Sequence, residues 1–144
     1  MLSRWSTIAP VVVVLMLVTL GVRHSLFSSS PTVILPQGLA VALSIWARRS
    51  FQRGAFSTSA SPAGPTLIAN GPYRIIRHPM YTAALLFIWS GILGHWSAVN
   101  ALIGLIATAT AAIRITVEER LLRARYADYA EYASRTKRFV PFIF

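Results

Sequence analysis

Residues 79–117, PMYTAALLFIWSGILGHWSAVNALIGLIATATAAIRITV, hold two apolar runs that meet at Gly94 and His95. The first run, 79–93, is short for a membrane span and either crosses the bilayer or turns back inside it, whereas the second, 96–117, is long enough to cross. Because the connection is so short, the two predicted helices form an antiparallel hairpin. Small side chains on the second helix allow another backbone to approach closely, at Gly104, Thr108, Ala111 and Ala112.

The composition is that of a membrane protein. Of 144 residues, 55% are hydrophobic and 12% are charged, with a mean hydropathy of +0.57, whereas a soluble domain carries about 25% charged residues. The length fits one domain, so we expect a single membrane domain over residues 1–144. With no cysteine, the chain has no disulfide framework, Cys-ligated metal centre or thiol nucleophile.

The positive charge is unevenly placed. The formal net charge is +10, and most Lys and Arg residues lie within 48–77 and 114–138, with none between. They flank apolar runs, as in the cytoplasmic loops of polytopic membrane proteins, and lack the interleaved aromatics of a nucleic-acid surface. We therefore expect an integral protein of the plasma or inner membrane, with both termini and the active site cytoplasmic and with anionic lipid nearby. No nucleic-acid partner is expected.

Two further apolar runs precede the hairpin, so residues 1–47 are expected to form two N-terminal transmembrane helices. Residues 5–22 would rise about 27 Å as a helix, although Arg4 in front of them also fits a cleaved signal peptide. Residues 31–47 form a weaker span. A kink or close packing is predicted at its Pro36, Gln37 and Gly38. The fold class is therefore all-α and polytopic, with about four transmembrane helices.

Two segments are expected on the cytoplasmic side, a loop over 48–78 and a tail over 118–144. The loop is rich in Ser, Gly, Ala and Pro from residue 50 to 72. The tail is amphipathic, which indicates an interfacial helix or a lid over a cytoplasmic site, and Pro141 ends any helix there. One face of the tail carries Leu121, Leu122, Tyr126, Tyr129 and Tyr132.

The acidic residues are few and clustered. All four lie between 118 and 131, and Glu118 and Glu119 follow the fourth apolar run directly. Carboxylates at a membrane boundary are costly to bury, so they suggest a functional site. Arg114 lies four residues before Glu118, and a purely structural ion pair between the two is the alternative.

A second cluster is NGPYRIIRHPMY, residues 70–81. Pro79 suits the first position of the third helix, which places His78 near the N-cap, beside backbone N–H groups and the positive end of the helix dipole. Such a helix start binds a small anion such as a carboxylate, although a His-Pro pair is also common in plain turns. His24 and His95 have no metal-ligand spacing to His78, so no metal is expected.

In combination, these motifs are more specific than either alone. GPYRIIRHPMY, the apolar hairpin, RITVEE at 114–119, and the tail with YADY at 126–129 and VPFI at 140–143 resemble the isoprenylcysteine carboxyl methyltransferase family. That family is similar to the membrane phospholipid methyltransferases. The resemblance covers residues 67–144. Ala83 and Ala127 stand where the family usually has glycine.

The resemblance implies an S-adenosylmethionine-dependent methyltransferase whose cofactor binds at the cytoplasmic end of the hairpin. The methionyl carboxylate suits the His78 helix start, and the ammonium and sulfonium charges suit the two carboxylates. An aromatic wall is expected from Tyr73, Tyr81 or Trp89. The implied cofactor-binding residues are Tyr73, Arg77, His78, Pro79, Tyr81, Glu118 and Glu119.

The implied reaction needs donor and acceptor aligned away from water. A carboxylate acceptor on a lipophilic or lipidated, isoprenylcysteine-like molecule needs no base, and Arg114 is expected to hold it in a bidentate contact. A phospholipid or other amine acceptor would need a base, for which Glu119 and His78 are the candidates. The catalytic residues implied are thus Arg114 and Glu119. An NADPH-dependent reductase of the sterol-reductase type and a noncatalytic scaffold are the alternatives from other classes.

Overall fold

The regular structure of the protein is helical. The computed structural model describes residues 2–51 and 67–139, and within these ranges it contains no strand, only an isolated bridge between Ile76 and Lys137. This confirms the all-α prediction. The elements are α1 (Leu2–Val22), α2 (Pro31–Arg49), the short 3-10 helix η1 (Gly71–Arg74), α3 (Pro79–Gly94), α4 (Ala98–Arg125) and α5 (Tyr129–Arg135).

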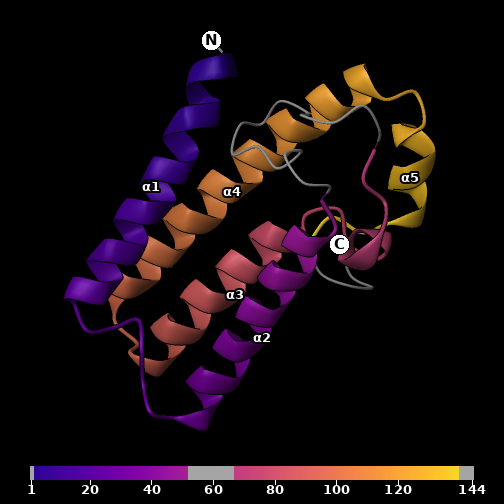
Figure 1. Cartoon of the computed structure of the whole chain (residues 1–144). Helices are drawn as coiled ribbons and strands as arrows, with labels where there is room; N and C mark the ends of the chain where they lie inside the picture. Colours follow the sequence, from indigo (N-terminus) through magenta and orange to yellow (C-terminus); the bar gives the residue numbers. More distant parts are fainter. Residues whose placement is uncertain (1, 52–66, 140–144) are drawn as a thin grey trace.

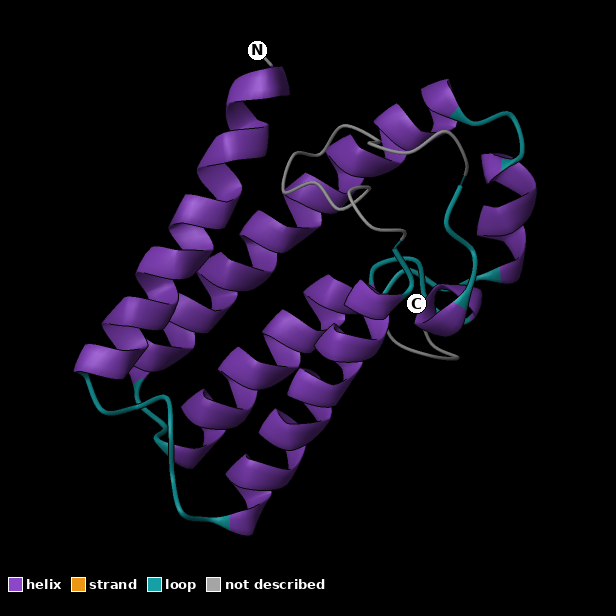
Figure 2. Ribbon diagram, in the orientation of Figure 1, coloured by secondary structure: helices purple, strands orange, loops and turns teal. Residues whose placement is uncertain are grey.

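The four long helices run side by side, with α3 between α2 and α4 and with α1 against α4 (Figure 1). The connections from α1 to α2 and from α3 to α4 lie at one end of the bundle, and η1 and α5 lie at the other (Figure 2). The antiparallel hairpin predicted for α3 and α4 is therefore present. Its polar end, beyond the apolar runs, is where the charged motifs gather.

The helix boundaries follow local signals. Pro31 and Pro79 each begin a helix, where the missing N–H of proline has no cost. The Ser97 side chain caps α4 by accepting a hydrogen bond from the backbone N–H of Asn100 at 3.1 Å. Helices predicted at 5–22, 31–47 and 79–93 are therefore found within a few residues of their expected bounds.

The tail differs from the prediction of one amphipathic helix after residue 117. α4 continues without a break to Arg125, because EERLLRAR contains only good helix formers. The chain leaves the helix at Tyr126, which is extended, and α5 is only seven residues long. Leu121 and Tyr129 thus belong to different helices. Residues 52–66 of the predicted loop and 140–144, with Pro141, lie outside the described residues.

Glycines of α3 and α4 lie in close contact with other parts of the chain. A Cβ added to Gly91 of α3 would lie 2.7 Å from the carbonyl oxygen of Leu26, and the same oxygen accepts a 2.7 Å hydrogen bond from the buried Gln37 side chain. Gly104 of α4 lies against Trp89, whose indole N–H donates to Thr108 at 3.0 Å. The small residues Gly104 and Thr108 thus make room for side chains of α3, Trp89 and Ile92, and the predicted close approach of another backbone stays a prediction.

Within the described residues, α4 is the one helix both long and apolar enough to cross a membrane, and the apolar stretches Val11–Val22 and Pro79–Gly94 are shorter. Large hydrophobic side chains nevertheless remain exposed on all four long helices. They include Val14, Leu15 and Val18 on α1, Ile34, Leu35 and Leu39 on α2, and Leu102, Leu105 and Ile113 on α4. The prediction of four spans stays a prediction.

We expect Gly91→Ala to destabilise the protein by about 1–3 kcal/mol, because its Cβ would press on backbone atoms that cannot rotate away. Gly38→Ala in α2 is the matched control, since nothing lies within 4 Å of its added Cβ, and it should be neutral or stabilise by up to about 1 kcal/mol. Unfolding of the detergent-solubilised protein measures both. Equal effects of the two substitutions would contradict the packing described here.

Candidate functional site

The site is assembled where residues 136–139, the C-terminal strap, run beside the chain that enters α3. The backbone N–H of Arg77 donates to the Lys137 carbonyl at 2.7 Å, and that of His78 donates to the Arg138 carbonyl at 3.2 Å. The Thr82 hydroxyl also donates to the Phe139 carbonyl at 2.7 Å. These bonds hold Arg138 next to the RHP motif, residues 77–79, although Arg138 is distant from that motif in the sequence.

The centre of the site is Glu119 on α4, which is 4% exposed. Its Oε1 accepts a hydrogen bond from Arg77 Nε at 3.0 Å and lies 3.4 Å from His78 Nε2. Its Oε2 accepts from Arg138 Nη2 at 3.1 Å. The RHP motif and the Glu-Glu motif, which are about forty residues apart in sequence, are thus in direct contact.

The Glu119 carboxyl is held in its charged form. Burial acts to raise its pKa, but the hydrogen bonds from His78 and Arg77 and the charges of Arg77 and Arg138 outweigh burial and lower the pKa to about 2. At neutral pH this residue is a carboxylate that accepts hydrogen bonds and binds protons weakly.

Arg77 also holds the end of α5. Its Nη1 donates to the Ala133 carbonyl at 2.8 Å and to the carbonyl of Thr136. The last carbonyls of a helix have no partner within it, and a guanidinium beside them is favourable. One largely buried side chain therefore joins the segment before α3 to α4 and α5.

A second group of contacts centres on Tyr81 of α3. Arg114 Nε donates to the Tyr81 hydroxyl at 2.5 Å, and this hydroxyl donates to Glu118 Oε2 at 2.9 Å. The tyrosine thus lies between two residues that the sequence suggested as a simple ion pair. The ring of His78 meets the Tyr81 ring edge-on at 5.8 Å, so the two groups of contacts are adjacent.

Tyr73 connects the site to the end of α2. It is buried in η1, packs edge-on against Phe51 and accepts a hydrogen bond on its carbonyl from the Tyr132 hydroxyl at 2.8 Å. Burial raises the pKa of the Tyr73 phenol, and the charge of Glu118 raises it further. Gly71 makes this packing possible: its φ is +55°, and a Cβ would clash with Ser50.

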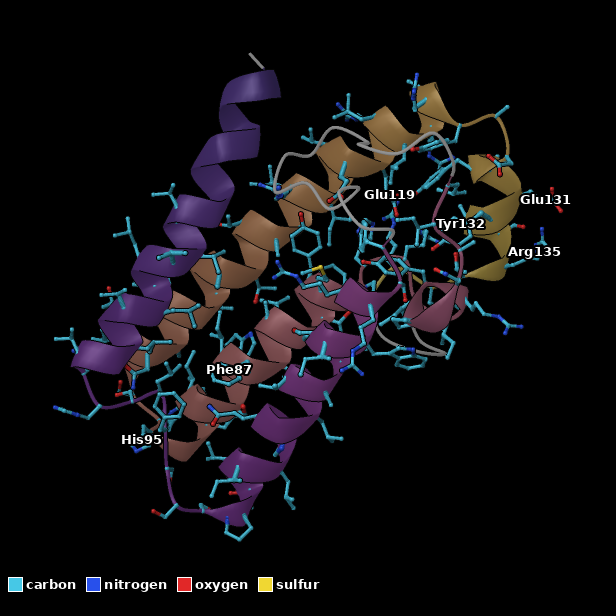
Figure 3. The ribbon with its side chains drawn as sticks, in the orientation of Figure 1. Phe87, His95, Glu119, Glu131, Tyr132 and Arg135 are labelled. Carbon is cyan, nitrogen blue, oxygen red and sulfur yellow. The ribbon has the colours of Figure 1, made fainter. Side chains whose placement is uncertain are left out.

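The predicted site residues from Tyr73 to Glu119 therefore gather at one end of the bundle. Figure 3 shows Glu119 and Tyr132 there, and His95 at the opposite end. Trp89 is not part of this group, because it packs against Gly104 and Thr108 more than two turns along α3.

Sequence reasoning missed Arg138 and the carbonyls of α5. The sequence showed Arg138 only as one more positive charge in the tail, and its contact with Glu119 depends on the path of the strap. In the described ranges 2–51 and 67–139, no group of three or more His, Asp or Glu side chains is arranged to hold a metal ion.

The structure is thus an apolar helical bundle that holds a cluster of buried ion pairs at one end. This combination is typical of helical membrane proteins with a polar functional site. The chain matches the family model of the phospholipid methyltransferases over residues 31–129, more than half of its length. It belongs to this family. Since the family includes isoprenylcysteine carboxyl methyltransferase-like proteins, the resemblance seen in the sequence is confirmed. The match also begins earlier, at α2, than the predicted methyltransferase-like region 67–144.

A similar curated protein is the cobalt-zinc-cadmium resistance protein CzcN of Cupriavidus metallidurans. The two chains are 38% identical over 77 residues, which are 53% of this chain and 36% of that protein. The match thus spans about a third of the relative's length. No solved structure matches the chain.

We expect Arg77→Ala to cost about 2–3 kcal/mol of stability, because Glu119 loses a charged hydrogen bond and keeps only His78 and Arg138, and the last carbonyls of α5 lose their donor. Arg135→Ala on α5 is the control, since its ion pair with Glu131 is 70% and 72% exposed and should contribute less than about 1 kcal/mol. Chemical denaturation in detergent measures both. Similar losses for the two variants would contradict the anchoring role of Arg77.

Proposed function

We propose that the protein is an S-adenosylmethionine-dependent membrane methyltransferase that methylates a carboxylate on a lipophilic, isoprenylcysteine-like acceptor. The observation that carries this proposal is the contact of Arg77 and His78 with Glu119. It joins the two motifs of the family resemblance in one charged site beside an apolar hairpin.

The donor set fits this cofactor, whose sulfonium supplies a transferable methyl group. Glu118 is half-buried and hydrogen-bonded by Tyr81, so it is well placed to meet an ammonium or sulfonium charge. Glu119 already has Arg77, His78 and Arg138 as partners, so its part is to hold these side chains in position. The N-terminal end of α3, at Pro79, favours the methionyl carboxylate.

Two features support a carboxylate acceptor over an amine. Arg114 is oriented by Tyr81 through its Nε, and a guanidinium suits a carboxylate in a bidentate contact. An amine acceptor, which the family description suggests, requires removal of a proton. Glu119, with a pKa near 2, is too weak a base for that step at neutral pH.

We also propose that the chain crosses the membrane four times, with both termini and the site on the cytoplasmic side. Exposed Leu, Ile and Val side chains on α1, α2 and α4 support this arrangement, as do the Arg and Lys residues at the site end. A lipophilic acceptor then enters from the bilayer, while the water-soluble cofactor enters from the cytoplasm.

The proposed cofactor is tested by calorimetric titration of the detergent-purified chain with S-adenosylhomocysteine. We expect binding to the wild type, at least tenfold weaker binding to Glu118→Gln because a charged contact is lost, and unchanged binding to the exposed control Glu131→Gln. NADPH should give no heat. A folded wild type that does not bind S-adenosylhomocysteine would overturn the proposal, and heat from NADPH alone would favour a reductase.

The proposed acceptor is tested with Arg114→Ala and N-acetyl-S-farnesylcysteine, an isoprenylcysteine with one free carboxyl group. The variant should lose at least a hundredfold in formation of the base-labile methyl ester, because the acceptor carboxylate loses its partner. Its affinity for S-adenosylhomocysteine should stay within about threefold of the wild type. Retained ester formation, or methylation of amines alone, would remove this role for Arg114.

A further inference from the structure

The hydroxyl of Tyr129 is buried without a partner. Tyr129 begins α5 and is 1% exposed. Among the described side chains, its hydroxyl is the one buried nitrogen or oxygen that has no hydrogen-bond partner. Burying an unpaired hydroxyl costs free energy that phenylalanine at the same place would avoid. A partner outside the chain would explain why this side chain carries a hydroxyl.

The ring of Tyr129 is fixed in place by its neighbours. The Arg123 guanidinium lies over the ring, 5.4 Å from its centroid, and the Tyr132 ring lies 5.9 Å away. Tyr132, on the same helix, also carries a hydroxyl, but this hydroxyl has a partner within the chain, because it donates to the Tyr73 carbonyl. Two tyrosines on one short helix thus differ in whether the hydroxyl is used within the chain.

The charges that act on the Tyr129 hydroxyl include those of Glu119 and Arg77, which form the centre of the candidate site. Burial raises the pKa of Tyr129 to about 12, the charges of Glu119 and Glu118 act in the same direction, and those of Arg77 and Arg123 oppose it. At neutral pH the phenol therefore keeps its proton and acts as a donor. Glu119 is already paired with Arg77 and Arg138, whereas the Arg123 guanidinium over the ring makes no ion pair with a described residue, so the place favours an acceptor that carries negative charge.

We propose that Tyr129 is a binding residue that donates a hydrogen bond to the carboxylate at the amino-acid end of the cofactor. This inference rests on the proposed function and adds a residue to it. Since the hydroxyl is closed off from solvent, a side chain of the cluster must move when the ligand enters. Arg123 is the side chain that can move, because it lies over the Tyr129 ring and is itself exposed.

Tyr129→Phe removes the donor and keeps the ring. In calorimetry on the full chain in detergent, we expect at least tenfold weaker binding of S-adenosylmethionine. Decarboxylated S-adenosylmethionine, which lacks only the carboxylate, should bind the variant and the wild type within about threefold. The thermal midpoint of the ligand-free variant should be unchanged or higher. Tyr132→Phe is the matched control and should lower the midpoint while leaving both affinities unchanged.

Each other outcome overturns the proposal. Unchanged affinity of Tyr129→Phe for S-adenosylmethionine would show that the hydroxyl meets no ligand. An equal loss for both ligands would place it on another part of the cofactor, and a lower thermal midpoint would mean that it has a partner within the chain. A folded wild type that binds neither ligand would instead overturn the proposed function, so the two failures are distinguishable.

Discussion

The burial of the Glu119 carboxylate is the constraint on which the charged end of the molecule depends. A carboxylate removed from water near the end of an apolar helix is costly unless cations and donors surround it. Arg77, His78 and Arg138 meet this requirement: the first two directly precede α3, and the third lies in the strap. Satisfying one charge thus fixes how α3, α4 and the last described segment lie together.

The adjacent residues Glu118 and Glu119 have different partners because of helix geometry. Successive residues on an α-helix point about 100° apart, so Glu118 and Glu119 cannot share one set of partners. Glu119 points into the Arg77 cluster, whereas Glu118 meets the Tyr81 hydroxyl, which also binds Arg114. One carboxylate therefore holds three segments together, and the other remains half-buried beside Tyr81.

The helices were predictable because apolar runs, Pro31 and Pro79 mark them locally. The tail was not, because helix propensity carries α4 beyond its apolar run, and nothing in the tail shows that α5 folds back on the bundle. The RHP and Glu-Glu motifs were found as site candidates from charge and position. The Arg138 contact, the anchoring of α5 by Arg77 and the burial of Tyr129 depend on tertiary structure, which no local pattern contains.

The C-terminal strap also determines when the site can form during biosynthesis. Arg77 and Thr136, which are hydrogen-bonded, lie 59 positions apart, and chains are made from the N-terminus. While α3 and α4 are already made, Glu119 still lacks Arg138, and Arg77 lacks the carbonyls of α5. The nascent protein therefore passes through a stage in which the carboxylate near the end of α4 is incompletely compensated, and that stage ends only after the strap has left the ribosome.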